Sequence, residues 1–146
     1  MTGCELCARG SDGQQHPGSV GGNVYEDEHW YAYHAPVTIA SLGQFFLVSK
    51  RHFLDFSEMT PAEAASYGRV LQALYAALKQ VVDAERVYLR VTLEGVPHFH
   101  AWLFPRRHGE TERGMAFMAA ERSCSEAEAL AVVGRLREVL ASRSDA

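Results

Sequence analysis

The sequence predicts an α+β domain with a largely antiparallel sheet, and three features support this prediction. Short runs rich in β-branched and aromatic residues occur in both halves of the chain. An amphipathic helix is expected over about 60–82, and another over 125–142. The order is strands, helix, strands, helix, which differs from the regular alternation that builds a parallel sheet. We therefore expect one long central helix and one C-terminal helix packed on the sheet.

Three strands are expected in the first half of the chain. Residues 8–22 are rich in glycine and polar side chains and have no hydrophobic period, so they are expected to form a loop. The segments 23–25 and 30–34 flank a polar turn, which is typical of a hairpin. The apolar run 44–49 is consistent with a buried strand, and a turn at 50–52 follows it.

Two helix starts are visible in the sequence. Thr60 and Glu63 form a capping box around Pro61, a residue that suits the first helical position. Apolar residues then recur at three- and four-residue spacing as far as position 82. A second capping pattern begins at Ser125. Between the helices, 86–93 and 98–104 are expected to form strands, separated by a break at 94–95.

Length and composition limit the class of protein. The 146 residues (16.2 kDa) suit a single domain over 1–146 with one hydrophobic core. No apolar run reaches the length of a membrane span, and the N-terminus lacks the basic and apolar stretches of a signal peptide. We therefore expect a soluble, cytoplasmic protein. Its net charge of -4 disfavours a nucleic-acid polymer or an anionic membrane as a partner.

The three cysteines are too few for a disulfide scaffold. Cys4 and Cys7 form a C-x-x-C, which serves as a redox dithiol, as half of a metal site, or occurs by chance. A redox C-x-x-C normally follows a strand and opens a helix, but only three residues precede Cys4 here. The metal site is therefore favoured over the redox dithiol. Cys124 stands alone and is expected to be a structural or exposed thiol.

The most informative segment is Val96-Pro-His-Phe-His-Ala-Trp-Leu-Phe-Pro-Arg106. Because side chains alternate along a strand, His98, His100, Trp102 and Phe104 are expected on one face. Two imidazoles at this spacing can ligate a metal, place a nucleophile beside a partner, or lie in solvent without a function.

This segment resembles the motif of the histidine triad (HIT) superfamily of nucleotide hydrolases and transferases, in which three histidines alternate with hydrophobic residues. The resemblance extends to the hairpin at 24–29, to the Gly-Gln-Phe-Phe-Leu-Val-Ser-Lys-Arg-His segment at 43–52, and to the helix start at Thr60-Pro61. It covers the chain from Cys4 to about Arg106 and implies a HIT-like fold.

The resemblance implies a structural zinc site. In branches of the superfamily with an N-terminal C-x-x-C, zinc is held by positions that correspond here to Cys4, Cys7, His52 and His98. Two thiolates and two imidazoles make a closed tetrahedral site that would tie the N-terminal segment 1–22 to the sheet. A closed site leaves no open position for water, which disfavours a zinc-dependent hydrolase.

The resemblance also implies a catalytic site. The middle triad histidine, here His100, attacks the α-phosphorus of a nucleotide to form a nucleotidyl-histidine intermediate. The expected substrates are nucleoside phosphate esters, phosphoramidates or dinucleoside polyphosphates. The alternative is a non-catalytic nucleotide-binding or regulatory module with the same fold. Superfamily proteins are commonly homodimers, so a homodimer is expected here.

The sequence departs from the superfamily pattern around this nucleophile. Trp102 replaces the third histidine, Gln44 replaces a separate upstream histidine, and the usual ribose-binding Asp has no counterpart after Tyr33. Glu94 lies in the loop where the superfamily carries polar phosphate contacts. We expect Gln44, Trp102, Glu94 and Arg106 to contact substrate. Simple packing of Trp102 and a solvated basic turn at Arg106 are the alternatives.

Overall fold

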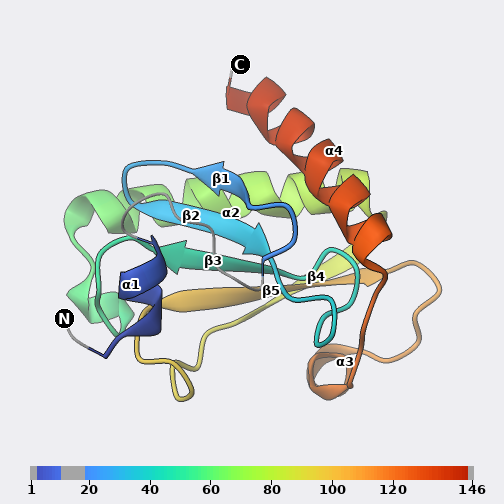
Figure 1. Cartoon of the computed structure of the whole chain (residues 1–146), viewed down its shortest axis with the longest axis horizontal. Helices are drawn as coiled ribbons and strands as arrows, with labels where there is room; N and C mark the ends of the chain where they lie inside the picture. The colour runs from blue at the N-terminus through green and yellow to red at the C-terminus, as the bar shows by residue number, and fades with distance from the viewer. Residues whose placement is uncertain (1–2, 11–18, 145–146) are drawn as a thin grey trace.

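The chain forms a five-stranded antiparallel sheet flanked by helices on both faces (Figure 1). The computed structural model describes residues 3–10 and 19–144. The strand order is β1-β2-β3-β5-β4, which confirms the predicted α+β class. The strands are β1 (Asn23–Glu26), β2 (Trp30–His34), β3 (Phe45–Ser49), β4 (Ala84–Arg90) and β5 (His100–Arg107). The helices are α1 (Glu5–Gly10), α2 (Pro61–Val81), α3 (Gly114–Ala119) and α4 (Glu126–Ser144), with a 3₁₀ turn, η1, at Phe56–Glu58.

The strand register determines which side chains meet across the sheet. Val48 of β3 lies opposite His100 of β5, and Phe46 lies opposite Trp102. On the other side of β5, Arg90 of β4 also lies opposite Trp102. Directly opposed residues point to the same face. Phe46, Trp102 and Arg90 therefore form a row across three strands, next to His100.

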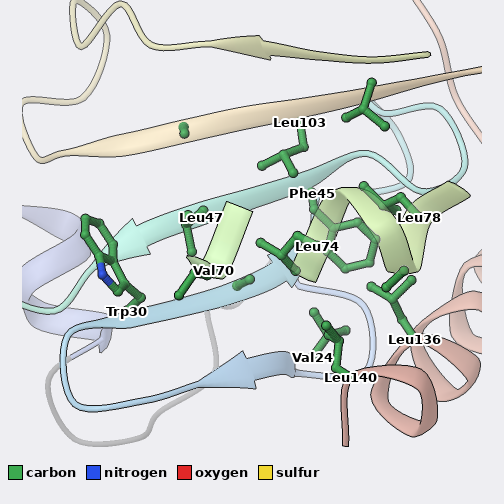
Figure 2. Packing of buried hydrophobic residues seen from close by; sticks show 14 of the residues in the cluster. Val24, Trp30, Phe45, Leu47, Val70, Leu74, Leu78, Leu103, Leu136 and Leu140 are labelled. Atoms are coloured by element: carbon green, nitrogen blue, oxygen red, sulfur yellow. The ribbon is translucent and has the colours of Figure 1, made fainter. Parts of the chain in front are cut away.

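One face of the sheet packs against α2 and α4. Figure 2 shows Val70, Leu74 and Leu78 of α2 pointing toward the strands, with Leu136 and Leu140 of α4 beside them. Burying each such side chain contributes about 1.5–3 kcal/mol. The start of α2 forms the predicted capping box, in which Thr60 accepts a hydrogen bond from the Glu63 amide. The main core therefore lies on this face.

The opposite face carries a second, smaller cluster of buried apolar residues. Leu6 of α1 packs there with Tyr31, Tyr33, Phe46 and Val48. This is the face to which His100 and Trp102 point, because Phe46 contacts both rings. The helix α1 thus covers the face that carries the predicted site.

Several elements differ from the sequence prediction. The predicted loop 8–22 begins within α1, and residues 11–18 of it lie outside the described residues. The strand β5 begins at His100 and not at His98, and β4 ends at Arg90. The short helix α3 was not expected, because Gly114 begins it without a side-chain cap. Among the described helices, none is both long and apolar enough to span a bilayer.

Candidate functional site

Four potential metal ligands come together at the N-terminal edge of β5. The ligand atoms of Cys4, Cys7, His52 and His98 all lie within 4.8 Å of one another. The Cys7 Sγ lies 3.3 Å from His52 Nδ1 and 3.4 Å from His98 Nδ1, and Cys4 Sγ lies 3.4 Å from the same His98 nitrogen. Residues 94 positions apart in the sequence therefore form one cluster.

The donor set and its spacing fit the zinc site that the resemblance implies. In a tetrahedral site with Zn–S of about 2.3 Å and Zn–N of about 2.0 Å, sulfur and nitrogen ligands lie about 3.5 Å apart. The S···N distances of 3.3–3.4 Å are close to this value. The four residues also supply the four protein ligands that a closed site requires. The cluster is therefore suited to bind a metal ion.

A backbone carbonyl fixes the tautomer of His98. Its Nε2 lies 2.7 Å from the carbonyl oxygen of Ser49, an atom that only accepts hydrogen bonds. Nε2 therefore carries the proton, and the lone pair of Nδ1 faces the two sulfurs. Burial lowers the pKa of His98, which favours the neutral ligand form. Such a second-shell contact is typical of metal-ligating histidines.

The turn that carries His52 is tied to the start of α2. Arg51 donates to both carboxylate oxygens of Glu63, at 2.8 Å for the shortest contact, and Glu63 belongs to the α2 capping box. The neighbouring Phe53 is buried and stacks on Phe99 at 5.0 Å. These contacts on either side hold His52 next to His98.

The thiols must lose their protons for the cluster to hold a metal. Burial, followed by the neighbouring Cys4, raises the pKa of Cys7. Metal binding therefore releases protons and becomes weaker as the pH falls.

His100 is oriented by the residue two positions before it. Its Nδ1 lies 2.7 Å from the carbonyl oxygen of His98, so Nδ1 carries the proton and donates it to that bond. In the neutral imidazole this leaves the lone pair of Nε2 for chemistry. Phe99 lies between the two histidines and is fully buried in the core, which directs both imidazoles away from the α2 face.

His100 borders an apolar cavity of about 150 Å³ on the α1 face of the sheet. Tyr33, Phe46 and Val48 from β2 and β3 form its floor, and Leu6 of α1 contributes one wall. Because Leu6 lies between the two cysteines, the metal cluster and this cavity share a structural element. The cavity is suited to an aromatic or other apolar group placed beside a nucleophile.

Trp102 and Gln44 lie beyond this cavity, along the same face. Trp102 packs edge-on against Phe46 at 4.1 Å and stacks on Phe104 at 5.7 Å. Gln44 is buried, and its Oε1 accepts a hydrogen bond from the Ser41 amide at 3.3 Å. Both residues line a second cavity, and both side chains carry neutral hydrogen-bond donors.

The other two predicted substrate contacts are Arg106 and Glu94. Arg106 is 2% exposed; its guanidinium donates to Glu85 and to the Tyr88 hydroxyl, each at 3.1 Å. It lies six residues along β5 from His100, which is about 20 Å at the rise of a strand. Arg106 is thus paired with Glu85 and Tyr88, at a distance from His100. Glu94 is exposed on the β4–β5 connection.

Sequence reasoning missed two residues around the site. Arg90 lies over Trp102, and His34 holds the loop before β3 by accepting a hydrogen bond from the Gly43 amide at 3.0 Å. The alternation of Arg86, Tyr88 and Arg90 would have indicated a polar strand face. Without the β4–β5 register, however, it could not be aligned with Trp102.

Comparison with solved structures shows which fold this is. A zinc-bound histidine triad family protein from Mycobacterium smegmatis aligns with a TM-score of 0.73 and 20% identity, over 98% of this chain and 96% of that one. The chain has the histidine triad fold. A hypothetical histidine triad nucleotide-binding protein from Sulfolobus tokodaii (TM-score 0.66, 19% identity, 82% of this chain and 83% of that one) shares it. So does a HIT family protein from Bacillus anthracis (TM-score 0.61, 21% identity, 99% and 96%).

The HIT resemblance found in the sequence is therefore confirmed at the level of the fold. No protein-family profile matches the chain, and no curated protein matches it. With identities near 20%, the histidine triad neighbours establish the architecture, and the chemistry must be argued from the site itself.

Proposed function

We propose that this protein is a HIT-like nucleotide hydrolase or nucleotidyltransferase that works through a nucleotidyl-histidine intermediate on His100. The observation that carries the proposal is the hydrogen bond from His100 Nδ1 to the His98 carbonyl, because in the neutral imidazole it directs the Nε2 lone pair to chemistry beside a cavity. The apolar cavity suits a nucleoside base, and a solved structure described as a hypothetical histidine triad nucleotide-binding protein shares the fold.

In the proposed reaction, His100 Nε2 attacks the α-phosphorus and the bond from phosphorus to the leaving group breaks. The leaving group departs with the electron pair. Water or another acceptor then attacks the same phosphorus, gives up a proton and releases the nucleotide from His100. The Nδ1–H···O=C bond holds the imidazole in one orientation through both steps.

We also propose that the metal is zinc and that its role is structural. Cys4, Cys7, His52 and His98 would hold it, and a four-ligand site supplies conformational order and no water-activating position. Within the described residues, this site joins α1 to the start of β5 and thereby supports both Leu6 and His100.

A non-catalytic nucleotide-binding module is the second candidate. Trp102 favours it, because this residue occupies the third triad position and offers no ionisable group. Both candidates predict nucleotide binding, so they must be separated by covalent chemistry.

The test is to incubate the protein with adenosine phosphoramidate or diadenosine tetraphosphate labelled at the α-phosphorus. We expect acid-labile label on the protein and released AMP, and a loss of turnover of at least about 10³-fold in His100→Ala. His108→Ala is the matched control, since His108 is an exposed imidazole at the far end of β5. Tight binding by the wild-type protein without label or release would favour the non-catalytic module.

A further inference from the structure

A second cavity, of about 210 Å³, lies beside the one that contains His100. The two cavities share Ile39 in their walls and are lined by successive residues of β5 on one face. His100 borders the first, whereas Trp102 and Phe104 border the second. The two cavities are thus neighbours along β5, one apolar and beside His100, the other lined by arginine side chains.

Arg90 makes the second cavity suited to an anion. Its guanidinium lies 4.9 Å from the ring centroid of Trp102 and 4.9 Å from that of Phe104, and the two rings are nearly parallel, at 10°. A guanidinium stacked on aromatic faces keeps its edge N–H groups available for a planar or tetrahedral anion. In the part of the chain that the structure describes, no carboxylate is ion-paired with Arg90.

Two other charged residues, Arg122 and Glu121, also line this cavity. Arg122 is ion-paired with Glu110 at 3.5 Å and with Glu112 at 3.4 Å. Glu121 lines it as an exposed residue. Arg90 is therefore the cation whose charge is left for a ligand.

The spacing relates Arg90 to the reaction at His100. Arg90 lies directly opposite Trp102, and Trp102 is two residues from His100, which is about 7 Å along a strand. An anion at Arg90 would therefore be separated from a phosphorus at His100 by a distance that one or two phosphate groups span.

From this juxtaposition we infer that the Arg90–Trp102 cavity is a subsite for an oligophosphate leaving group, which makes dinucleoside polyphosphates the preferred substrate class. The inference rests on the proposed function and deepens it. As the His100 Nε2–phosphorus bond forms, the bond from the α-phosphorus to the bridging oxygen breaks. The oligophosphate leaves with that electron pair as an oxyanion, and Arg90 stabilises its charge.

The first test compares two substrates that share AMP and differ in the leaving group. Diadenosine tetraphosphate loses an oligophosphate, whereas adenosine phosphoramidate loses ammonia, which is too small to reach Arg90. We expect Arg90→Gln to lower the ratio of kcat/KM for the two substrates at least tenfold, and Arg90→Lys to lower it less. Arg86→Gln is the control, because it removes an exposed arginine from the same strand and should leave both substrates unchanged. An unaltered ratio in Arg90→Gln would overturn the subsite.

The second test does not depend on turnover. Titration of each variant with inorganic tripolyphosphate, followed by calorimetry, should show binding to wild type and Arg86→Gln, and at least tenfold weaker binding to Arg90→Gln. Arg90-dependent binding without turnover of either substrate would refute the proposed function and support the anion subsite. Equal binding by wild type and Arg90→Gln, or no binding by either, would refute the subsite itself.

Discussion

At the scale of single residues, the backbone of His98 orients the imidazole of His100. The ring of His98 belongs to the metal cluster and is oriented by the Ser49 carbonyl, while its own carbonyl orients His100. The same residue therefore links the metal cluster to the proposed nucleophile through its side chain and its backbone. A change at His98 would alter both.

His34 shows how burial of a neutral histidine makes stability depend on pH. Its Nδ1 donates to the Ala35 carbonyl at 2.7 Å, and its Nε2 accepts from the Gly43 amide at 3.0 Å, so the neutral ring has both partners satisfied. Desolvation lowers its pKa, and the apolar ring of Phe45 packs against it with the ring centroids 5.0 Å apart. In the unfolded chain His34 takes up a proton near pH 6.5, whereas in the folded protein it stays neutral to lower pH. Acidification below pH 6.5 therefore stabilises the unfolded state relative to the folded state.

We predict that His34→Gln reduces this pH dependence. The glutamine amide supplies a donor and an acceptor but does not titrate. Below pH 6.5, the free energy of unfolding should therefore fall less steeply with decreasing pH in His34→Gln than in wild type. The difference in slope is up to about 1.4 kcal/mol per pH unit. Urea denaturation at pH 7.5 and pH 5.5 measures the difference. The other histidines are common to both proteins, so their effects cancel. Parallel pH profiles would show that His34 does not contribute.

At the scale of elements, α1 depends on the cluster of potential metal ligands formed by Cys4, Cys7, His52 and His98. It has six residues, which is too short for a stable isolated helix. Cys4 and Leu6 are nevertheless buried, and Cys4 accepts a hydrogen bond from the Cys7 amide at 3.4 Å. The contacts of the two cysteines with His52 and His98 therefore supply the order that the helix itself lacks.

Cys4→Ser should lower zinc content and thermal stability together. Serine is a poor zinc ligand, and metal-binding energy is folding energy in such sites. We expect substoichiometric zinc and a loss of at least about 2 kcal/mol, which lowers Tm by at least about 6 °C. Metal analysis and thermal melts measure the two effects. Cys124→Ser is the matched control, because Cys124 lies outside the cluster. Full zinc occupancy in Cys4→Ser would contradict the structural site.

The elements that the sequence predicted are those with a local signal. The α2 helix has a capping box and a long apolar stripe, and the β2 and β3 strands are buried apolar runs, so their existence followed from pattern alone. By contrast, α3 is stabilised by tertiary contacts, since Phe117 is buried against Tyr88 at 5.6 Å and under Arg122 at 4.0 Å. Such packing overrides local preference and is not visible in a short segment.

The candidate site also has a part that the sequence predicted and a part that it did not. Its metal cluster was predicted from the resemblance, because Cys4, Cys7, His52 and His98 occupy positions with known counterparts in the superfamily. The Arg90 contact was not predictable, because it depends on which residue of β4 lies opposite Trp102. Spacing along the chain determines a strand face, whereas pairing between strands needs the register.

At the scale of the whole molecule, β4 and α2 present a surface suited to a second copy of the chain. Within residues 3–10 and 19–144, the seven-residue β4 strand is at the edge of the sheet, and one row of its backbone groups has no neighbouring strand. Leu89 of β4 is 37% exposed. An open, largely apolar groove lies on α2 and includes Leu71 and Tyr75. A two-fold axis beside β4 would continue the sheet into a second copy of the chain.

We therefore predict a homodimer with twice the 16.2 kDa chain mass in light scattering after size-exclusion chromatography. Placing a charge in the interface leaves it desolvated and unpaired, so Leu89→Asp and Tyr75→Asp should each raise the dimer Kd by at least about tenfold. The two variants report separately on the strand and on the helix. Met115→Asp is the control, because Met115 is 81% exposed on α3 and lies on a different element. A dimer that tolerates Leu89→Asp but not Tyr75→Asp would indicate assembly through α2 without continuation of the sheet. A wild-type chain that remains monomeric at high micromolar concentration would refute the prediction.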